Sequence, residues 1–163
     1  RGMTLYLEPK FLYNSNLAKA VVPEGFAVPF GKARLRREGK DLTILAYGTP
    51  VHFALEAAET LAKEGVEVEV VDLRSLLPLD TETIFASVKK THRVLVAHED
   101  KVFGGFGGEV AAQVSEACFP WLDAPVGRVG STFTPVGFNR ILERAVLPST
   151  PKVLEAARRV LAF

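Results

Sequence analysis

The chain has 163 residues and a formal net charge of +1, from 20 basic and 19 acidic residues. A chain of this length forms one ordinary domain that buries about 70% of its unfolded surface, so a hydrophobic core can form without disulfides or metal ions. The balanced charge provides no general attraction to nucleic acid or to acidic membranes, so we expect neither as a partner.

Hydrophobic residues make up 48% of the sequence and charged residues 24%, which is typical of a folded globular protein and not of a disordered one. The single cysteine, Cys118, excludes a disulfide within the chain and a thiolate metal cluster. No apolar run reaches the roughly 18 residues that span a bilayer. We therefore expect a cytoplasmic location, or the mitochondrial matrix if the protein is eukaryotic.

The first 41 residues show no clear hydrophobic period. Residues 4–7 are strand-like and follow the first residues without a polar lead-in, which suggests a piece of a longer protein, with residues left from a tag as the alternative. Turn-forming residues then recur at Glu8-Pro9 and at Val22-Pro23-Glu24-Gly25. We predict that residues 8–41 form a long linker wrapped on a surface.

From residue 42 onward, strand and helix patterns alternate. Residues 42–47 form a short apolar run with β-branched side chains, which predicts a buried strand. Thr49 and Pro50 then supply an N-cap and a first-turn proline for a helix, whose apolar residues recur at three-and-four spacing until Gly65.

The alternation continues to the C-terminus, where Thr150 is the expected cap of the last helix. Further strands are predicted at 66–73, 93–97 and about 126–129, and helices after Asp80 and at about 107–119, 138–144 and 151–161. Such an order predicts an α/β fold of three layers, with a mostly parallel sheet covered by helices on both faces.

A glycine cluster, Gly104-Gly105-Phe106-Gly107-Gly108, follows a predicted strand and begins a helix. Backbone N–H groups in such a position can hold a phosphate or another anion. The spacing differs from a dinucleotide-binding fingerprint, because Val110 stands where the last glycine would be, and the ending of a P-loop is missing. The alternative is that the glycines only allow the helix to pack closely on the strands.

His98-Glu99-Asp100 lies at the carboxyl end of a predicted strand, where open α/β sheets gather their sites. A histidine beside carboxylates could act as an acid, a base or a metal ligand. The alternative is a set of hydrogen bonds in a turn or a subunit contact. Because His52 and His92 lie in separate elements, no metal-binding spacing exists, and we predict no metal site.

Four other side chains carry predictions about packing. Cys118 lies on the apolar stripe of its helix, so we expect it to be buried and inert. Phe103, Phe106 and Phe133 lie in glycine-rich or irregular segments where no periodicity assigns them to a core. We predict that they form a dimer interface, with local loop packing as the alternative.

Eight segments in chain order carry a family resemblance: Leu7–Lys10, Leu12–Tyr13, Tyr47–Thr49, Val71–Pro78, Ser87–Thr91, His98–Glu109, Leu122–Val129 and Leu147–Pro148. Together they resemble the β subunit of thiamin diphosphate-dependent 2-oxo acid dehydrogenases, of the pyruvate or branched-chain type. The resemblance implies a transketolase C-terminal domain-like fold at residues 28–163. Residues 1–27 would be an interdomain linker and the end of a preceding domain.

The resemblance also implies a function. The whole enzyme would oxidatively decarboxylate a 2-oxo acid on thiamin diphosphate with magnesium, and acylate lipoyl groups. Its partners would be an α subunit or α segment, a second β subunit and a lipoyl acyltransferase core. Because the Gly-Asp-Gly motif that holds the cofactor does not occur here, we expect this chain to bind no cofactor, to contain no catalytic residue and to be inactive alone. It would serve assembly, dimerisation and partner docking.

One departure from the family pattern lies after Arg128-Val129. An Asp and a Pro-x-Pro usually follow there, whereas Phe133 and Gly137 occupy the matching positions around Pro135. Two other functions stay open. One is an independent small-molecule or nucleotide-binding α/β module, and the other is the C-terminal domain of a transketolase or deoxyxylulose phosphate synthase.

Overall fold

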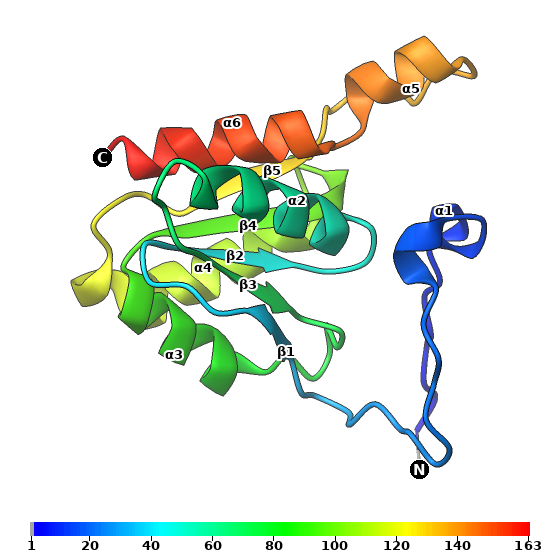
Figure 1. Cartoon of the computed structure of the whole chain (residues 1–163), viewed down its shortest axis with the longest axis horizontal. Coiled ribbons are helices and arrows are strands. Elements are labelled where there is room, and N and C mark those ends of the chain that lie inside the picture. Colours follow the sequence, from blue (N-terminus) through cyan, green and yellow to red (C-terminus); the bar gives the residue numbers. More distant parts are fainter. Residues whose placement is uncertain (1) are drawn as a thin grey trace.

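A five-stranded sheet organises the protein, as a computed structural model that describes residues 2–163 shows (Figure 1). The strands are β1 (Arg34–Arg37), β2 (Leu42–Ala46), β3 (Val68–Asp72), β4 (Val94–Lys101) and β5 (Gly127–Ser131). Their spatial order is β1-β3-β2-β4-β5, and every pairing is parallel except that of β1 with β3. The predicted, mostly parallel sheet is confirmed.

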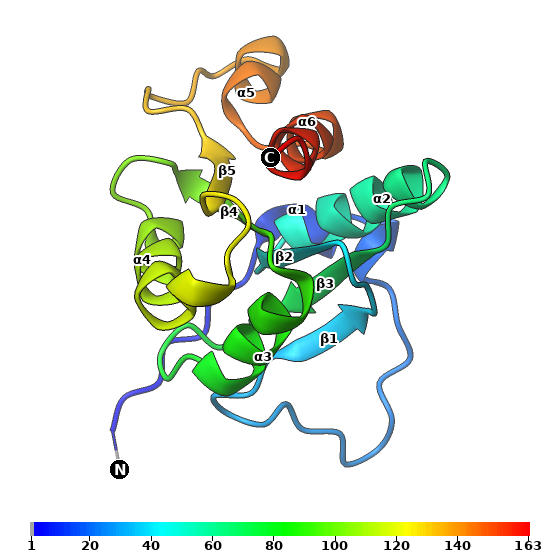
Figure 2. The ribbon, with the colours of Figure 1, turned by 90° about the vertical axis from the view of Figure 1, so that its left-hand side faces the viewer.

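Helices cover both faces of this sheet, as the α/β pattern predicted (Figure 2). The longer ones are α2 (Pro50–Ala62), α3 (Thr81–Thr91), α4 (Phe106–Cys118) and α6 (Thr150–Leu161). One core cluster joins α2 and α6 to the sheet, and a second joins α3 and α4 to its other face. The three-layer architecture follows, because β2 is buried along its whole length and needs cover on both sides.

The prediction that residues 8–41 form a linker on the surface is wrong for the edge strand β1, which belongs to the sheet. Its sequence, Arg-Leu-Arg-Arg, has no apolar run, so nothing in it predicts a strand. Tertiary contacts provide the reason for its conformation, since Arg36 pairs with Asp72 and Arg37 with Glu67 while the backbone pairs with β3. A charged edge strand also discourages pairing with other chains.

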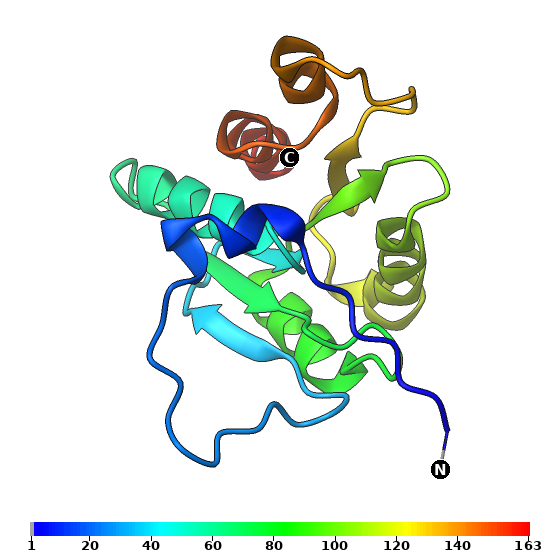
Figure 3. The same ribbon diagram turned by 90° about the vertical axis from the view of Figure 1, so that its right-hand side faces the viewer.

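Before β1, residues 2–33 contain a short helix, α1 (Lys10–Tyr13), and one 3-10 turn, η1 (Asn16–Ala18). Residues 4–7 form no strand, contrary to their apolar pattern, because no neighbouring strand offers a partner for their backbone. Figures 1 and 3 place α1 beyond the carboxyl ends of the central strands. There Pro9 lies over Gly48, 3.4 Å from where a β-carbon on that glycine would be.

The remaining elements connect the β5 edge to the C-terminus. A 3-10 turn, η2 (Phe119–Trp121), follows α4, and a short helix, α5 (Arg140–Val146), lies between β5 and α6. Ser149, one residue before the expected Thr150, is the N-cap of α6. In residues 2–163, no helix is both long enough and apolar enough to cross a bilayer.

Candidate functional site

His98 lies near the end of β4, with its side chain wholly buried. Its ring is stacked on Tyr47, which directly follows β2, with centroids 6.3 Å apart and planes 11° apart. Within residues 2–163, neither ring nitrogen has a hydrogen-bond partner. The structure therefore places the predicted histidine inside the protein, between the two central strands and the start of α4.

Three glycines enclose the His98 ring. A β-carbon on Gly107 would overlap the ring, and one on Gly130 would lie 2.9 Å from the imidazole Cε1. A β-carbon on Gly105 would lie 3.0 Å from the same atom, and would also overlap the carbonyl oxygen of Lys101. Gly105 and Gly107 of the glycine cluster thus allow the start of α4 to pack directly on the histidine.

Burial lowers the pKa of His98, and the positive charge of Arg128 lowers it further, while Asp100 opposes the shift. The folded protein therefore favours the neutral imidazole. The side chain of Glu99 is exposed, because successive residues of a strand point to opposite faces of the sheet. The backbone oxygen of Glu99 accepts a hydrogen bond from the Ser131 hydroxyl. The structure does not bring His98 and Glu99 together as an acid–base pair.

Tyr47 extends the packed region toward α4. Its ring meets the edge of Phe106 in a T-shaped contact, with centroids 6.2 Å apart and planes 80° apart. Burial, together with the negative charge of Asp100, raises the pKa of Tyr47 to about 12, so the phenol stays protonated. Phe106 is half-buried and packs on the core cluster that joins α3 and α4 to the sheet. It was predicted to form a dimer interface with Phe103 and Phe133.

Phe103 and Phe133 lie side by side on the surface, although 30 residues separate them in the chain. Their ring centroids are 4.8 Å apart, and the side chains are 72% and 70% exposed. The structure therefore brings together two of the three phenylalanines predicted for an interface. Phe103 directly precedes the glycine-rich loop whose Gly105 and Gly107 contact His98, whereas Phe133 follows β5.

A second set of exposed apolar side chains, which the pattern analysis missed, follows Phe133 in the sequence. Val136, Phe138, Ile141 and Leu142 are all exposed, and Phe138 is wholly so. Figure 1 shows that the segment containing α5 projects from the body of the protein. We call residues 133–142 the apolar arm. The spacing of Phe138, Ile141 and Leu142 gave a helical stripe, but the sequence alone did not reveal that the stripe faces solvent.

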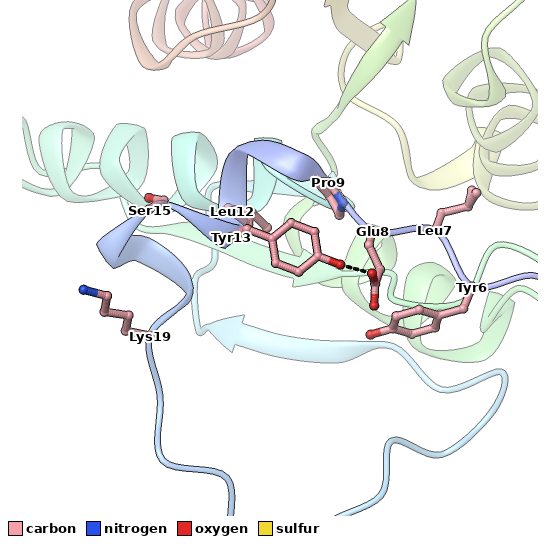
Figure 4. Close-up of a pocket in the computed structure, with 8 residues that line it drawn as sticks. All are labelled: Tyr6, Leu7, Glu8, Pro9, Leu12, Tyr13, Ser15 and Lys19. Carbon is pink, nitrogen blue, oxygen red and sulfur yellow. Dashed lines mark hydrogen bonds between the residues drawn. The ribbon is translucent and has the colours of Figure 1, made fainter.

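Two hollows lie outside this region. One, of about 340 Å³, is formed by residues 6–19. Figure 4 shows the side chains that line it, among which the Tyr13 hydroxyl donates to the Glu8 carboxylate. The other, of about 820 Å³, runs along α4 beside β5. Its walls are Gly108, Ala111, Ala112 and Ser115 of α4 on one side, and residues of the segment 119–128 on the other. We call it the α4–β5 groove.

Two further predictions concern single side chains and metals. Cys118 is wholly buried in the core, and burial raises the pKa of its thiol. Among residues 2–163, the structure gathers no three His, Cys, Asp or Glu side chains of the kind that hold a metal ion.

Comparison with known proteins places the chain in a family. Residues 31–153 match the family described as transketolase, C-terminal domain. The chain is 42% identical over 157 residues to the mitochondrial pyruvate dehydrogenase E1 component subunit beta-2 of Oryza sativa subsp. japonica, covering 95% of this chain and 42% of that one. It is also 42% identical over 159 residues to the pyruvate dehydrogenase E1 component subunit beta of Bacillus subtilis (strain 168), covering 98% and 48%. The chain thus spans less than half the length of these curated relatives.

Solved structures agree. A structure described as a split gene transketolase, inactive beta4 tetramer, superposes with a TM-score of 0.75 at 33% identity, covering 88% of this chain and 46% of that one. A transketolase from Pichia stipitis shares the fold, with a TM-score of 0.55 at 17% identity over 82% of this chain and 18% of that one. The chain therefore belongs to the transketolase C-terminal domain family, and it is similar to pyruvate dehydrogenase E1 β subunits over nearly its whole length.

Proposed function

We propose that this chain is the assembly and partner-docking domain of the β subunit of a thiamin diphosphate-dependent 2-oxo acid dehydrogenase. The observation that carries the proposal is the exposed pair of Phe103 and Phe133, together with the four exposed apolar side chains that follow Phe133 along the apolar arm. Large apolar side chains that gather on a protein surface favour an interface with another protein. The similarity to pyruvate dehydrogenase E1 β subunits supports the choice of enzyme.

The whole enzyme would oxidatively decarboxylate a 2-oxo acid and acylate lipoyl groups, and this chain would contribute no catalytic group. Its sequence contains no Gly-Asp-Gly motif, and its one buried histidine is held neutral among glycines, away from any carboxylate cluster. These residues do not fit the diphosphate and magnesium of the cofactor. We therefore assign no step of the thiamin diphosphate chemistry to this chain, and place the cofactor in other parts of the enzyme.

Three partners follow from this role: a second β subunit, an α subunit or α segment, and the lipoyl acyltransferase core. A second β subunit has support from the similar split gene transketolase, which is described as a beta4 tetramer. Two relatives that are mitochondrial in plants, and one from a bacterium, support the mitochondrial matrix or the bacterial cytoplasm as the compartment.

We also propose that residues 1–27 are a linker with the end of a preceding domain, and that residues 28–163 are the domain itself. Most of the side chains from residue 2 to residue 30 are exposed, and the apolar ones include Leu5, Tyr6, Val21 and Phe26. Such a segment gains cover only from a neighbouring domain or subunit.

The alternative of an independent nucleotide-binding module loses its main support, because contacts with the His98 ring account for the glycines at 105 and 107. The C-terminal domain of a transketolase is the nearer alternative, since it belongs to the same family. Identities above 40% to E1 β subunits, against 33% to the split gene transketolase and 17% to a transketolase of Pichia stipitis, support the dehydrogenase.

Sedimentation of the chain at micromolar concentration tests the proposal. We expect a dimer or a larger assembly, and a Phe103→Asp variant that sediments as a monomer, because the change buries an unpaired charge in each copy of a two-fold contact. A Phe103→Leu variant keeps the apolar surface and should stay associated. A monomeric unmodified chain would refute the proposed assembly role.

A further inference from the structure

Of the three histidines in the sequence, only His98 is wholly buried. In the part of the chain that the structure describes, neither nitrogen of its ring donates or accepts a hydrogen bond. Buried polar atoms are nearly always paired, so an unpaired imidazole requires an explanation. A neutral ring tolerates this position at moderate cost, whereas an imidazolium would bury a charge and two N–H donors without acceptors.

Two segments of the chain, residues 100–105 and residues 128–134, close over the His98 ring. Gly105 of the first segment and Gly130 of the second lie against the same atom of the imidazole, its Cε1. The exposed aromatic pair described above has one ring on each segment. The position of that pair therefore depends on how the two segments meet over the histidine.

Hydrogen bonds hold the two segments together beside the ring. The Val102 backbone N–H donates to the Ser131 carbonyl oxygen over 3.0 Å, and the Arg128 Nη1 donates back to the Val102 carbonyl oxygen over 3.1 Å. The Lys101 ammonium donates to the Thr134 carbonyl oxygen. These contacts join the segments to each other, and none of them involves the imidazole.

The groups around His98 give a proton on its ring little support. Asp100 of β4 attracts such a proton and Arg128 of β5 repels it, while Tyr47 after β2 stacks on the ring and stays protonated. The first turn of α4 contributes Glu109, whose carboxylate accepts a hydrogen bond within the helix. An imidazolium therefore needs water as its acceptor, and the close glycine contacts exclude water from the closed structure.

We propose that His98 is a proton-controlled switch: when the imidazole takes up a proton from solvent, residues 100–105 separate from residues 128–134, water reaches the ring, and the Phe103–Phe133 pair comes apart. The open state binds the proton near the ordinary histidine pKa of about 6.5, whereas burial lowers the pKa of His98 in the closed state. Opening therefore becomes more favourable by up to about tenfold for each pH unit below 6.5, until the closed state is protonated as well.

Hydrogen exchange of the Val102 amide measures this opening, because that N–H donates across the two segments. After correction for the intrinsic pH dependence of exchange, its protection should fall about fivefold or more between pH 7 and pH 5.5. His98→Gln, which does not titrate, should show no such fall. His52→Gln and His92→Gln are matched controls that keep the buried histidine, so both should behave as the unmodified chain does.

Two further measurements separate the switch from general unfolding. At pH 5.5 the amide of Ile44, in the central strand β2, should still exchange at least tenfold more slowly than that of Val102, since the opening is local. Asp100→Asn removes the negative charge that favours the protonated ring, so it should move the loss of Val102 protection to lower pH. A merely structural role for His98 would not produce that displacement.

The consequence for association rests on the proposed assembly role. The dissociation constant measured by sedimentation should rise in acid together with Val102 exchange, and should stay constant in His98→Gln. Unchanged Val102 protection in acid, or the same fall in His98→Gln, overturns the switch and leaves the assembly role standing. A chain that is monomeric at both pH values overturns the assembly role, and the exchange of Val102 still decides whether His98 controls the two segments.

Discussion

The glycine-rich loop before α4 joins two regions with opposite physical character. At Gly105 and Gly107 the backbone packs on the buried His98 ring so closely that even a methyl group would collide with its surroundings. Two residues before Gly105, Phe103 turns outward and leaves most of its ring in solvent beside Phe133. The first region is complete within one copy of the chain, whereas the second exposes apolar surface that another chain can cover. Changes in the first should therefore affect folding, and changes in the second should affect association.

The largest effect is expected at Gly107. A Gly107→Ala substitution puts a methyl group into the His98 ring, and we expect the free energy of unfolding to fall by about 3 kcal/mol. Gly108→Ala in the same turn is the matched control. Its methyl group meets only the flexible end of Arg128, so its stability should change by less than about 1 kcal/mol. Urea denaturation measures both, and equal losses would contradict the role assigned to the His98 contact.

A double variant sharpens this test. If the overlap with the ring causes the loss, truncation of the ring in His98→Ala should make the added methyl group at Gly107 much less costly. The coupling free energy between the two positions should then exceed about 1 kcal/mol. Additive effects would show that the two groups do not interact as the structure indicates.

The apolar arm should behave in the opposite way. Phe138→Ser removes a wholly exposed ring, so the unfolding free energy of the monomer should change by no more than about 0.5 kcal/mol. Its dissociation constant for self-association should rise at least tenfold if the arm lies in the interface, as measured by sedimentation at several concentrations. A large loss of monomer stability would place Phe138 in a core instead.

A smaller effect is expected from pH. Burial lowers the pKa of His98 in the folded chain, so on acidification the unfolded chain takes up a proton near its ordinary pKa of about 6.5 before the folded chain does. Stability should therefore be full above that value and decrease as the pH falls toward the lowered pKa of the folded state. His98→Gln should reduce the slope of the urea midpoint between pH 7.5 and pH 5.5.

A His52 variant is needed as a control in this experiment, because burial and the nearby Arg36 lower the pKa of His52 as well. His52 therefore contributes to the same pH dependence of stability. His52→Gln should reduce part of the same slope. If His98→Gln leaves the slope of the unmodified chain unchanged, the buried imidazole does not contribute to the pH dependence.

Among the substitutions, the smallest effect on association is expected at Cys118. The thiol is wholly buried, and burial raises its pKa, so the folded chain should react with a thiol reagent far more slowly than the chain in denaturant. Cys118→Ala should keep the same state of association, because the side chain faces the core and not the groove. Rapid labelling of the folded chain would show that α4 opens or faces solvent.

Periodicity and chemical type determined much of this protein before any contact was known. Alternating apolar runs and amphipathic helices specify a mostly parallel sheet with two helical layers, since only that arrangement buries both faces of a strand such as β2. The apolar stripe of α4 likewise predicted the burial of Cys118. These features are local, because each depends on residues a few positions apart.

Only the tertiary structure decided the features that depend on distant residues. The arginine-rich β1 became a strand through its backbone pairing and ion pairs with residues about 30 to 40 positions away, which no local pattern encodes. The same holds for His98, whose polar side chain gave no sign that glycines from α4 and β5 would enclose it. Phe103 and Phe133 became one surface, while Phe106 turned inward onto Tyr47, because the fold and not the spacing selects which side of a loop meets the core.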